Sequence, residues 1–167
     1  MAIIKHKEQT VAIFIDVQNL YYSARHLYNK KVNFAEIVKA ALASRKLIRA
    51  IAYVVSTKTG EEKPFFEALG KIGIETKEKE LQEFFGGAKK ADWDVGIAID
   101  MVRICPIVST VILVSGDGDF TPVVEYMKSQ GKQVELVAFG RTTSAKLKEA
   151  TDDFTDLDKN VKKFLLR

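Results

Sequence analysis

The chain has 167 residues, of which 47% are hydrophobic and 29% are charged, a length and composition typical of one soluble globular domain. With 26 Lys and Arg against 22 Asp and Glu, the formal net charge is only +4, and the basic residues are spread along the sequence. This mild excess is compatible with an anionic partner but does not by itself indicate nucleic-acid binding.

Three further features narrow the class of protein. The single cysteine, Cys105, excludes an internal disulfide framework and is typical of a reducing compartment. No apolar run approaches the roughly 20 residues that cross a bilayer, and the stretch MAIIKHKEQT lacks the apolar region of a secretory signal. We therefore expect a cytoplasmic protein without a membrane partner.

The first third of the chain alternates buried strands with helices. The continuous apolar run Val11–Ile15 predicts a strand that is covered on both faces. Helical spacing follows over Leu20–Tyr28 and again over Phe34–Ala43, where Asn33 is the expected N-cap. The apolar run Leu47–Val55 predicts the second strand.

The middle of the chain is more polar. Glu61–Leu69 has helical spacing, and the charged run Ile74–Leu81 predicts an edge strand, because charged side chains suit the edge of a sheet. The stretch F-F-G-G-A-K-K over Phe84–Lys90 predicts a flexible basic loop. Asp92–Ile104 then has helical spacing, and Pro106 marks the end of that helix.

The last third returns to short strands and helices, expected at Val111–Val114, Thr121–Ser129, Gln133–Phe139, Thr143–Ala150 and Phe154–Leu157. Thr121 is the expected N-cap of the first of these helices, with Pro122 in its first turn, and Thr142 or Thr143 that of the second. Strands that alternate with helices predict an α/β fold, a mostly parallel sheet with helices on both faces. Without internal repeats or a linker, residues 1–167 are expected to form one domain.

Acidic side chains follow two of the predicted strands at the point where each strand ends. The first strand runs into Asp16 (F-I-D-V-Q-N-L), and the strand Val111–Val114 runs into Asp117 and Asp119 (V-S-G-D-G-D-F-T-P). In open parallel sheets, ligands bind beyond the carboxyl ends of the strands, where the strand order reverses direction. Either segment alone could be a turn or a helix cap, but together they predict one site.

The predicted helix Asp92–Ile104 adds acids of its own. Asp94 lies near the start of this helix and can face the strand ends. Asp100 lies six residues further on, about 240° around a regular helix, so these two side chains cannot share one stripe. Asp100 stands among apolar residues and could instead pair with Arg103 at i+3.

The chemistry of these acids favours a cation. Clustered carboxylates raise one another's pKa unless a positive charge neutralises them. The two histidines, His6 and His26, lie outside the acidic motifs, and a donor set made of oxygens alone favours Mg²⁺ or Mn²⁺ over Zn²⁺. The sequence has neither a glycine-rich phosphate loop nor a Ser-His-Asp or Cys-His arrangement that can be assembled. The acids therefore predict a metal site.

Three stretches of the chain form a set that is specific when taken together: F-I-D-V-Q-N-L, K-K-A-D-W-D-V-G-I-A-I-D-M and V-I-L-V-S-G-D-G-D-F-T-P-V-V. They resemble the signature of NYN domains, which belong to the PIN-like ribonuclease superfamily, and are most similar to the LabA-like branch. The resemblance covers roughly residues 10–158. It implies a PIN-like three-layer α/β/α sandwich around a mostly parallel sheet of strand order 3-2-1-4-5.

The resemblance also implies the roles of individual acids. Asp16, Asp94, Asp117 and Asp119 match the catalytic acids that hold Mg²⁺ or Mn²⁺ for phosphodiester hydrolysis in this family. Asp100 matches a further recurrent aspartate and is carried over as a metal ligand, despite the helical geometry that separates it from Asp94.

Polar and basic side chains around the acids are the expected substrate contacts: Asn19, Ser115, Lys90, Arg141, Thr143 and Ser144. The hydroxyls of Thr143 and Ser144 could equally cap a helix. Asp92-Trp93 departs from the family pattern, where a smaller apolar residue is expected, and Trp93 could either pack or offer a base-stacking face.

Together these features predict a metal-dependent ribonuclease whose partner is RNA and which is a possible homodimer. Two alternatives remain open. One is a regulatory nucleic-acid-binding module that keeps the acids with little or no turnover. The other is a metal-dependent phosphatase, which needs a D-x-D-x-T-type start, whereas the first strand here ends in D-V-Q-N.

Overall fold

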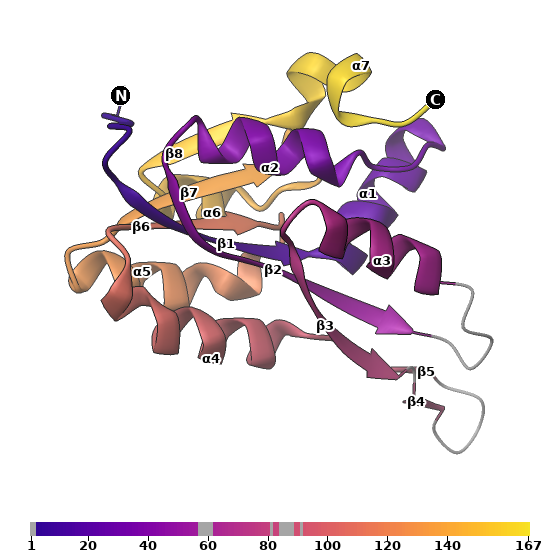
Figure 1. Ribbon diagram of the computed structural model, residues 1–167, viewed down its shortest axis with the longest axis horizontal. Coiled ribbons are helices and arrows are strands. Elements are labelled where there is room, and N and C mark those ends of the chain that lie inside the picture. The colour runs from indigo at the N-terminus through magenta and orange to yellow at the C-terminus, as the bar shows by residue number, and fades with distance from the viewer. Residues whose placement is uncertain (1–2, 57–61, 81, 84–88, 91) are drawn as a thin grey trace.

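A six-stranded sheet forms the middle layer of the protein, whose computed structural model describes residues 3–56, 62–80, 82–83, 89–90 and 92–167 (Figure 1). In sheet order the strands are β3 (Glu75–Glu80), β2 (Lys46–Ser56), β1 (Thr10–Asp16), β6 (Thr110–Val114), β7 (Gln133–Ala138) and β8 (Asp153–Asp156). Each neighbouring pair is parallel. The expected order 3-2-1-4-5 is therefore confirmed, and β8 extends it as a sixth strand.

Helices cover both faces of this sheet (Figure 1). One face carries α1 (Val17–Tyr28), α2 (Phe34–Leu42), α3 (Lys63–Lys71) and α7 (Val161–Phe164), and the other carries α4 (Asp94–Ile104), α5 (Thr121–Ser129) and α6 (Ala145–Ala150). None of the helices in the described part of the chain is long and apolar enough to cross a membrane.

Strand β1 shows why the central strands are apolar at almost every position. Val11, Ile13 and Ile15 pack against the helices of the first face, whereas Ala12 and Phe14 pack against those of the second. Because both faces are covered by helices, successive side chains are all buried and the sequence shows no polar alternation.

Smaller elements complete the fold. Gln82–Glu83 (β4) and Lys89–Lys90 (β5) form an antiparallel pair, and residues 84–88 of the predicted loop lie outside the described residues. Turns of 3₁₀ helix occur at Cys105–Ile107, Gly118–Phe120, Gly140–Thr142 and Leu157–Asn160. The predicted edge strand is confirmed, since β3 closes one edge of the six-stranded sheet.

The helix caps agree only partly with the prediction. Asn33 is confirmed, because its side chain accepts a hydrogen bond from the Glu36 N–H at 3.3 Å. Thr121 as an N-cap is wrong, since it already has helical backbone angles and continues a 3₁₀ turn. For α6 the prediction of Thr142 or Thr143 is also wrong, because the Ser144 hydroxyl accepts from the Leu147 N–H.

A buried ion pair holds together the end of the sheet opposite to the acids. Both nitrogens of the Arg45 fork donate to the Glu135 carboxylate, at 2.7 and 2.9 Å. Arg45 also donates to the carbonyls of Ala41 and Leu42, and the exposed fractions of the two side chains are 0% and 3%. Since the two residues are 90 positions apart, the pair ties the loop before β2 to β7.

Candidate metal centre

Three carboxylates meet beyond the carboxyl ends of β1 and β6. One oxygen from each of Asp94, Asp117 and Asp119 lies within 4.8 Å of the other two. Asp94 is the first residue of α4, and the other two flank Gly118 in the turn that follows β6. Because β1 and β6 are neighbours at the point where the strand order reverses, the acids lie where open parallel sheets bind their ligands.

Asp16 lies beside this group and is anchored by hydrogen bonds. It is the last residue of β1 and also the N-cap of α1, so that no loop separates strand from helix. Its carboxylate accepts from the Asn19 N–H at 3.2 Å and from the Ser115 hydroxyl at 3.1 Å. The Ser115 hydroxyl accepts from the Asp117 N–H at 3.2 Å, and the Asn19 amide oxygen accepts from the Gly116 N–H at 2.9 Å. Asn19 and Ser115, expected to contact substrate, therefore join β1 to the acidic turn.

The acids perturb one another. Burial, assisted by the charges of Asp117 and Asp92, raises the pKa of Asp16 to about 6. Burial also raises the pKa of Asp94 to about 7, together with its hydrogen bond to Asp117 and the charges of Asp117, Asp16 and Asp92. Such shifts are expected where carboxylates crowd together without a cation between them.

Asp92 also belongs to this neighbourhood, although it was not among the predicted site residues. It is exposed, and its charge contributes to the raised pKa values of Asp16 and Asp94. A pocket of about 480 Å³ combines acids with an apolar wall, and its lining is Asp92, Asp94, Val95, Ala98, Asp119, Phe120, Pro122 and Val123. The D-W-D pattern ahead of α4 was the available signal for Asp92.

Trp93 packs within the protein. Its indole N–H donates to the Val54 carbonyl at 2.8 Å, and its ring meets Tyr53 edge to face at 5.3 Å between centroids. The Lys79 ammonium lies 4.7 Å from the ring centroid, and a Cβ at Gly96 would lie 2.7 Å from the ring. The ring is therefore held by internal contacts on the side of α4 and β3.

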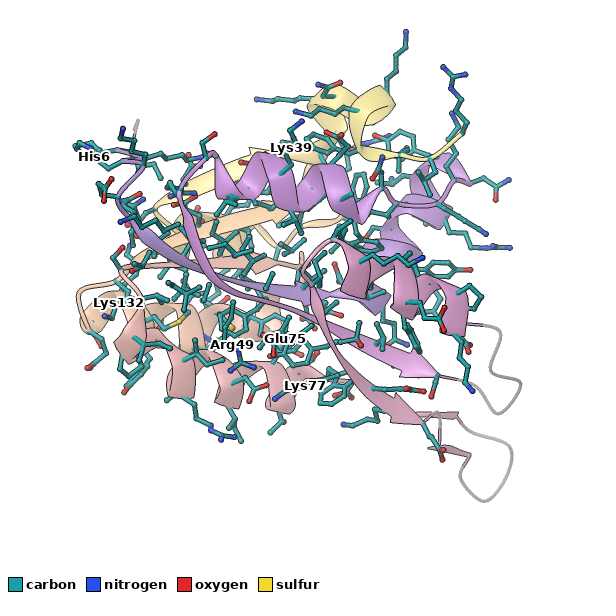
Figure 2. The ribbon with its side chains drawn as sticks, in the orientation of Figure 1. His6, Lys39, Arg49, Glu75, Lys77 and Lys132 are labelled. Carbon is teal, nitrogen blue, oxygen red and sulfur yellow. The ribbon has the colours of Figure 1, made fainter. Side chains whose placement is uncertain are left out.

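Asp100 lies apart from the other acids. Its carboxylate accepts hydrogen bonds from Lys77 at 2.7 Å and from the Tyr53 hydroxyl at 2.8 Å, and Arg103 lies 3.8 Å away. Figure 2 shows Lys77 on β3 beside α4. Although burial opposes the shift, the hydrogen bonds from Lys77 and Tyr53 hold the pKa of Asp100 below its usual range. With its charge neutralised in this way, Asp100 is left out of the proposed metal site.

Of the other predicted substrate contacts, Thr143 and Ser144 lie against the acidic turn at Gly116 and Gly118 but have internal partners. The Thr143 hydroxyl donates to the Phe139 carbonyl at 2.7 Å, and the Ser144 hydroxyl caps α6. Arg141 is exposed, with its guanidinium 5.2 Å from the Tyr28 ring centroid and 3.7 Å from Asp158. Lys90 lies in β5, and its side chain falls outside the described part of the structure.

Gly116 is required where the acidic turn meets the segment after β7. A Cβ at this position would lie 2.9 Å from the Thr143 hydroxyl and 3.1 Å from the Thr142 carbonyl oxygen. We expect Gly116→Ala to lower the free energy of unfolding by about 1–3 kcal/mol, because backbone must move to make room. Urea unfolding measures this loss. The control is Gly70→Ala in α3, where an added Cβ meets nothing within 4 Å, so that the free energy of unfolding should rise by about 0.5–1 kcal/mol. Equal losses in the two variants would contradict the packing argument.

The raised pKa values predict an unusual pH dependence for the metal-free protein. The folded state binds the protons of Asp16 and Asp94 more tightly than the unfolded chain, in which both groups return to about 3.8. Their contribution to stability is fully present below pH about 4 and is lost as the pH rises towards about 7. A cation needs the deprotonated carboxylates, so the increase in Tm caused by Mn²⁺ should grow over the same range.

Thermal unfolding at stepped pH, in EDTA and in Mn²⁺, measures this dependence. The double variant Asp16→Asn/Asp94→Asn should have a flatter pH profile in EDTA and a smaller response to Mn²⁺. Identical profiles for this variant and the wild type would contradict the assignment.

The donor set fits a hard divalent cation. One carboxylate oxygen from each of the three residues lies within 4.8 Å of the other two, and Mg²⁺ is bound by oxygen ligands of this kind. All three donors are carboxylates, with no histidine or cysteine in the group, and such a set favours Mg²⁺ or Mn²⁺ over Zn²⁺.

Comparison with known proteins places this arrangement in a wider context. The family model described as NYN domain matches residues 10–158. The chain is 26% identical over 170 residues to the Low amplitude and bright protein LabA of Synechococcus elongatus, a match that covers 93% of this chain and 87% of that protein. It superposes with a TM-score of 0.87 on the crystal structure of a protein of unknown function from Vibrio parahaemolyticus, at 33% identity, covering 98% of this chain and 100% of the other.

Proposed function

The chain belongs to the NYN domain family, and from this premise we propose that it is a metal-dependent ribonuclease that hydrolyses RNA phosphodiester bonds. Membership of this family, within the PIN-like nuclease superfamily, indicates a nuclease-like or RNA-related role. The observation that carries the finer proposal is the group of carboxylate oxygens from Asp94, Asp117 and Asp119, within 4.8 Å of one another.

In the proposed mechanism, Asp94, Asp117 and Asp119 hold Mg²⁺ or Mn²⁺. When bound, the ion supplies a Lewis acid for the phosphoryl oxygens and a water of lowered pKa. Asp16 positions the acidic turn through Ser115 and adds negative charge that favours the cation. Asp119, the most exposed of the three ligands, is the one best placed to orient an attacking water.

The pocket beside the acids is the proposed place for the nucleotide next to the scissile phosphate. Its lining combines the apolar Val95, Phe120 and Pro122 with acids of the cluster, so a sugar or base could pack there next to residues that would hold the cation. Exposed Arg141 is the proposed contact for a neighbouring phosphate.

Incubating the purified chain with labelled single-stranded RNA, and with DNA of the same sequence, tests the proposal. We expect Mn²⁺-dependent cleavage of the RNA that EDTA abolishes. If the RNA stays intact with every divalent ion, the nuclease proposal is wrong. If the protein binds this RNA without cutting it, the result supports a regulatory nucleic-acid-binding module instead. The cytoplasmic location and the possible homodimer stay predictions, the latter to be checked by sedimentation velocity.

A further inference from the structure

A second pocket, of about 330 Å³, lies at the end of α1 that is remote from Asp16. Its lining is rich in cations and consists of Tyr21, Arg25, Asn29, Lys30, Lys31, Leu166 and Arg167. Figure 1 shows the last residues of the described chain beside this end of α1, where the Leu166 N–H donates to the Lys31 carbonyl at 2.8 Å. We call this site the basic pocket.

The lining of the basic pocket contains several cations and no acidic side chain. Within the described ranges, no acidic side chain lies within 4.0 Å of the charged groups of Arg25, Lys30 or Lys31. Arg25 donates instead to the Tyr21 hydroxyl at 3.4 Å. Three side-chain cations, those of Arg25, Lys30 and Lys31, share this pocket with no acidic side chain in its lining, and such a cluster favours a polyanion.

Stabilisation of α1 does not account for these charges. A cation in the last turn of a helix interacts favourably with the helix dipole, which explains Arg25 in α1. Lys30 and Lys31 lie beyond the helix, after Asn29 has ended it in a left-handed conformation with φ 51°. The charges of Lys30 and Lys31 therefore lie beyond the last turn of α1, where a cation interacts favourably with the helix dipole.

Helix α1 connects the basic pocket to the candidate metal centre. It begins at its cap Asp16, and its 12 residues span about 18 Å at 1.5 Å per residue. Along this length it exposes the rings of Tyr21 and Tyr22, which are 41% and 59% exposed and meet edge to face at 5.6 Å. Aromatic rings that lie between phosphate-binding cations are the usual platform for unpaired bases.

We propose that the basic pocket binds the phosphate backbone of single-stranded RNA, a few nucleotides away from the phosphodiester at the metal centre. The identity of the polymer as RNA rests on the proposed function, whereas the site itself rests on the unpaired cations and the exposed tyrosines. A single strand fits better than a duplex, because tyrosines can stack only on bases that are not already paired.

Equilibrium binding of a short fluorescent single-stranded RNA, measured by anisotropy in EDTA over a series of salt concentrations, tests the proposal. The variant is Arg25→Gln/Lys30→Gln/Lys31→Gln. Each phosphate contact contributes about 0.7 to the slope of log K against log salt for single strands. We expect the slope to fall by about 2 and the affinity at low salt to fall on the order of tenfold or more.

The matched control, Lys7→Gln/Lys39→Gln/Lys71→Gln, removes the same charge from exposed cations away from the basic pocket (Figure 2 labels Lys39). It should leave the slope unchanged, and thermal unfolding verifies that both triple variants fold. Equal losses in the two variants overturn the proposal, because general charge would then explain the binding.

Two further arms separate other anions from RNA. In one arm, vesicles that contain phosphatidylserine are titrated against the same proteins. In the other arm, free inorganic phosphate is titrated against them. Pocket-dependent binding of vesicles with unchanged RNA affinity overturns the proposal in favour of a membrane surface. Binding is measured without a divalent ion. A wild type that fails to cleave RNA therefore refutes the ribonuclease but does not affect the binding result.

Discussion

Replacing Asp117 by Asn is expected to lower the rate of RNA cleavage in Mn²⁺ by on the order of 1000-fold while the fold stays intact. Asp117 contributes one of the three clustered carboxylate oxygens, and several kcal/mol of charge stabilisation by the bound ion correspond to such a factor. The substitution preserves shape, and an Asn oxygen can still accept from the Asp119 N–H, as Asp117 does at 2.9 Å.

The matched control for this variant is Glu125→Gln, which removes one exposed carboxylate from α5 outside the cluster. Its cleavage rate should equal that of the wild type. Steady-state rates with a labelled single-stranded RNA measure both variants, and a thermal unfolding curve confirms that each is folded. If Asp117→Asn cleaves RNA as fast as Glu125→Gln, the acidic cluster is not the catalytic site.

Replacing Arg45 by Met is expected to lower the free energy of unfolding by about 3–5 kcal/mol. The substitution leaves the Glu135 carboxylate buried without its main partner, and burial alone would raise the pKa of that group. Since domains are stable by only about 5–15 kcal/mol, urea unfolding should show a large shift of the midpoint at unchanged slope.

Arg49 provides a control of the same chemistry at the surface (Figure 2). It forms the same forked pair, with Glu75 at 2.8 Å, but the two side chains are 35% and 51% exposed. Arg49→Met should therefore cost no more than about 1 kcal/mol. The double variant Arg45→Met/Glu135→Leu should recover much of the loss, because it removes the orphaned charge. Equal costs at Arg45 and Arg49 would show that burial does not set the strength of these pairs.

The sheet could be predicted from the sequence because its inner strands are covered on both faces. β1 and β6 contain continuous apolar runs of strand length that are rich in β-branched residues, which is the pattern of a strand buried on both faces. The acids were predictable for a related reason. Asp16 and the Asp117–Asp119 turn follow those strands directly, so that their positions along the chain place them at one edge of a parallel sheet.

Features that depend on distant residues could not be predicted in this way. The partners of Asp100 are Tyr53 in β2 and Lys77 in β3, which sequence spacing does not bring next to α4. The buried pair of Arg45 and Glu135 joins residues 90 positions apart. In each case the hydrogen-bond partner is known only once the strands have been placed in order.

The N-cap of α6 was predicted wrongly for a local reason. Ser144, Thr142 and Thr143 are all good capping residues, and the choice among them depends on backbone angles that composition does not reveal. Asp92 was missed as a member of the acidic neighbourhood because its place relative to the other acids depends on where α4 begins.

The anomalous scattering of a crystal soaked in Mn²⁺ tests whether the acidic cluster holds a metal ion. The acidic group predicts a peak among the carboxylates of Asp94, Asp117 and Asp119, and this peak should vanish in Asp117→Asn. A saturated crystal without a peak there, or with its only peak beside Asp100, would contradict the metal centre and with it the ribonuclease that we propose.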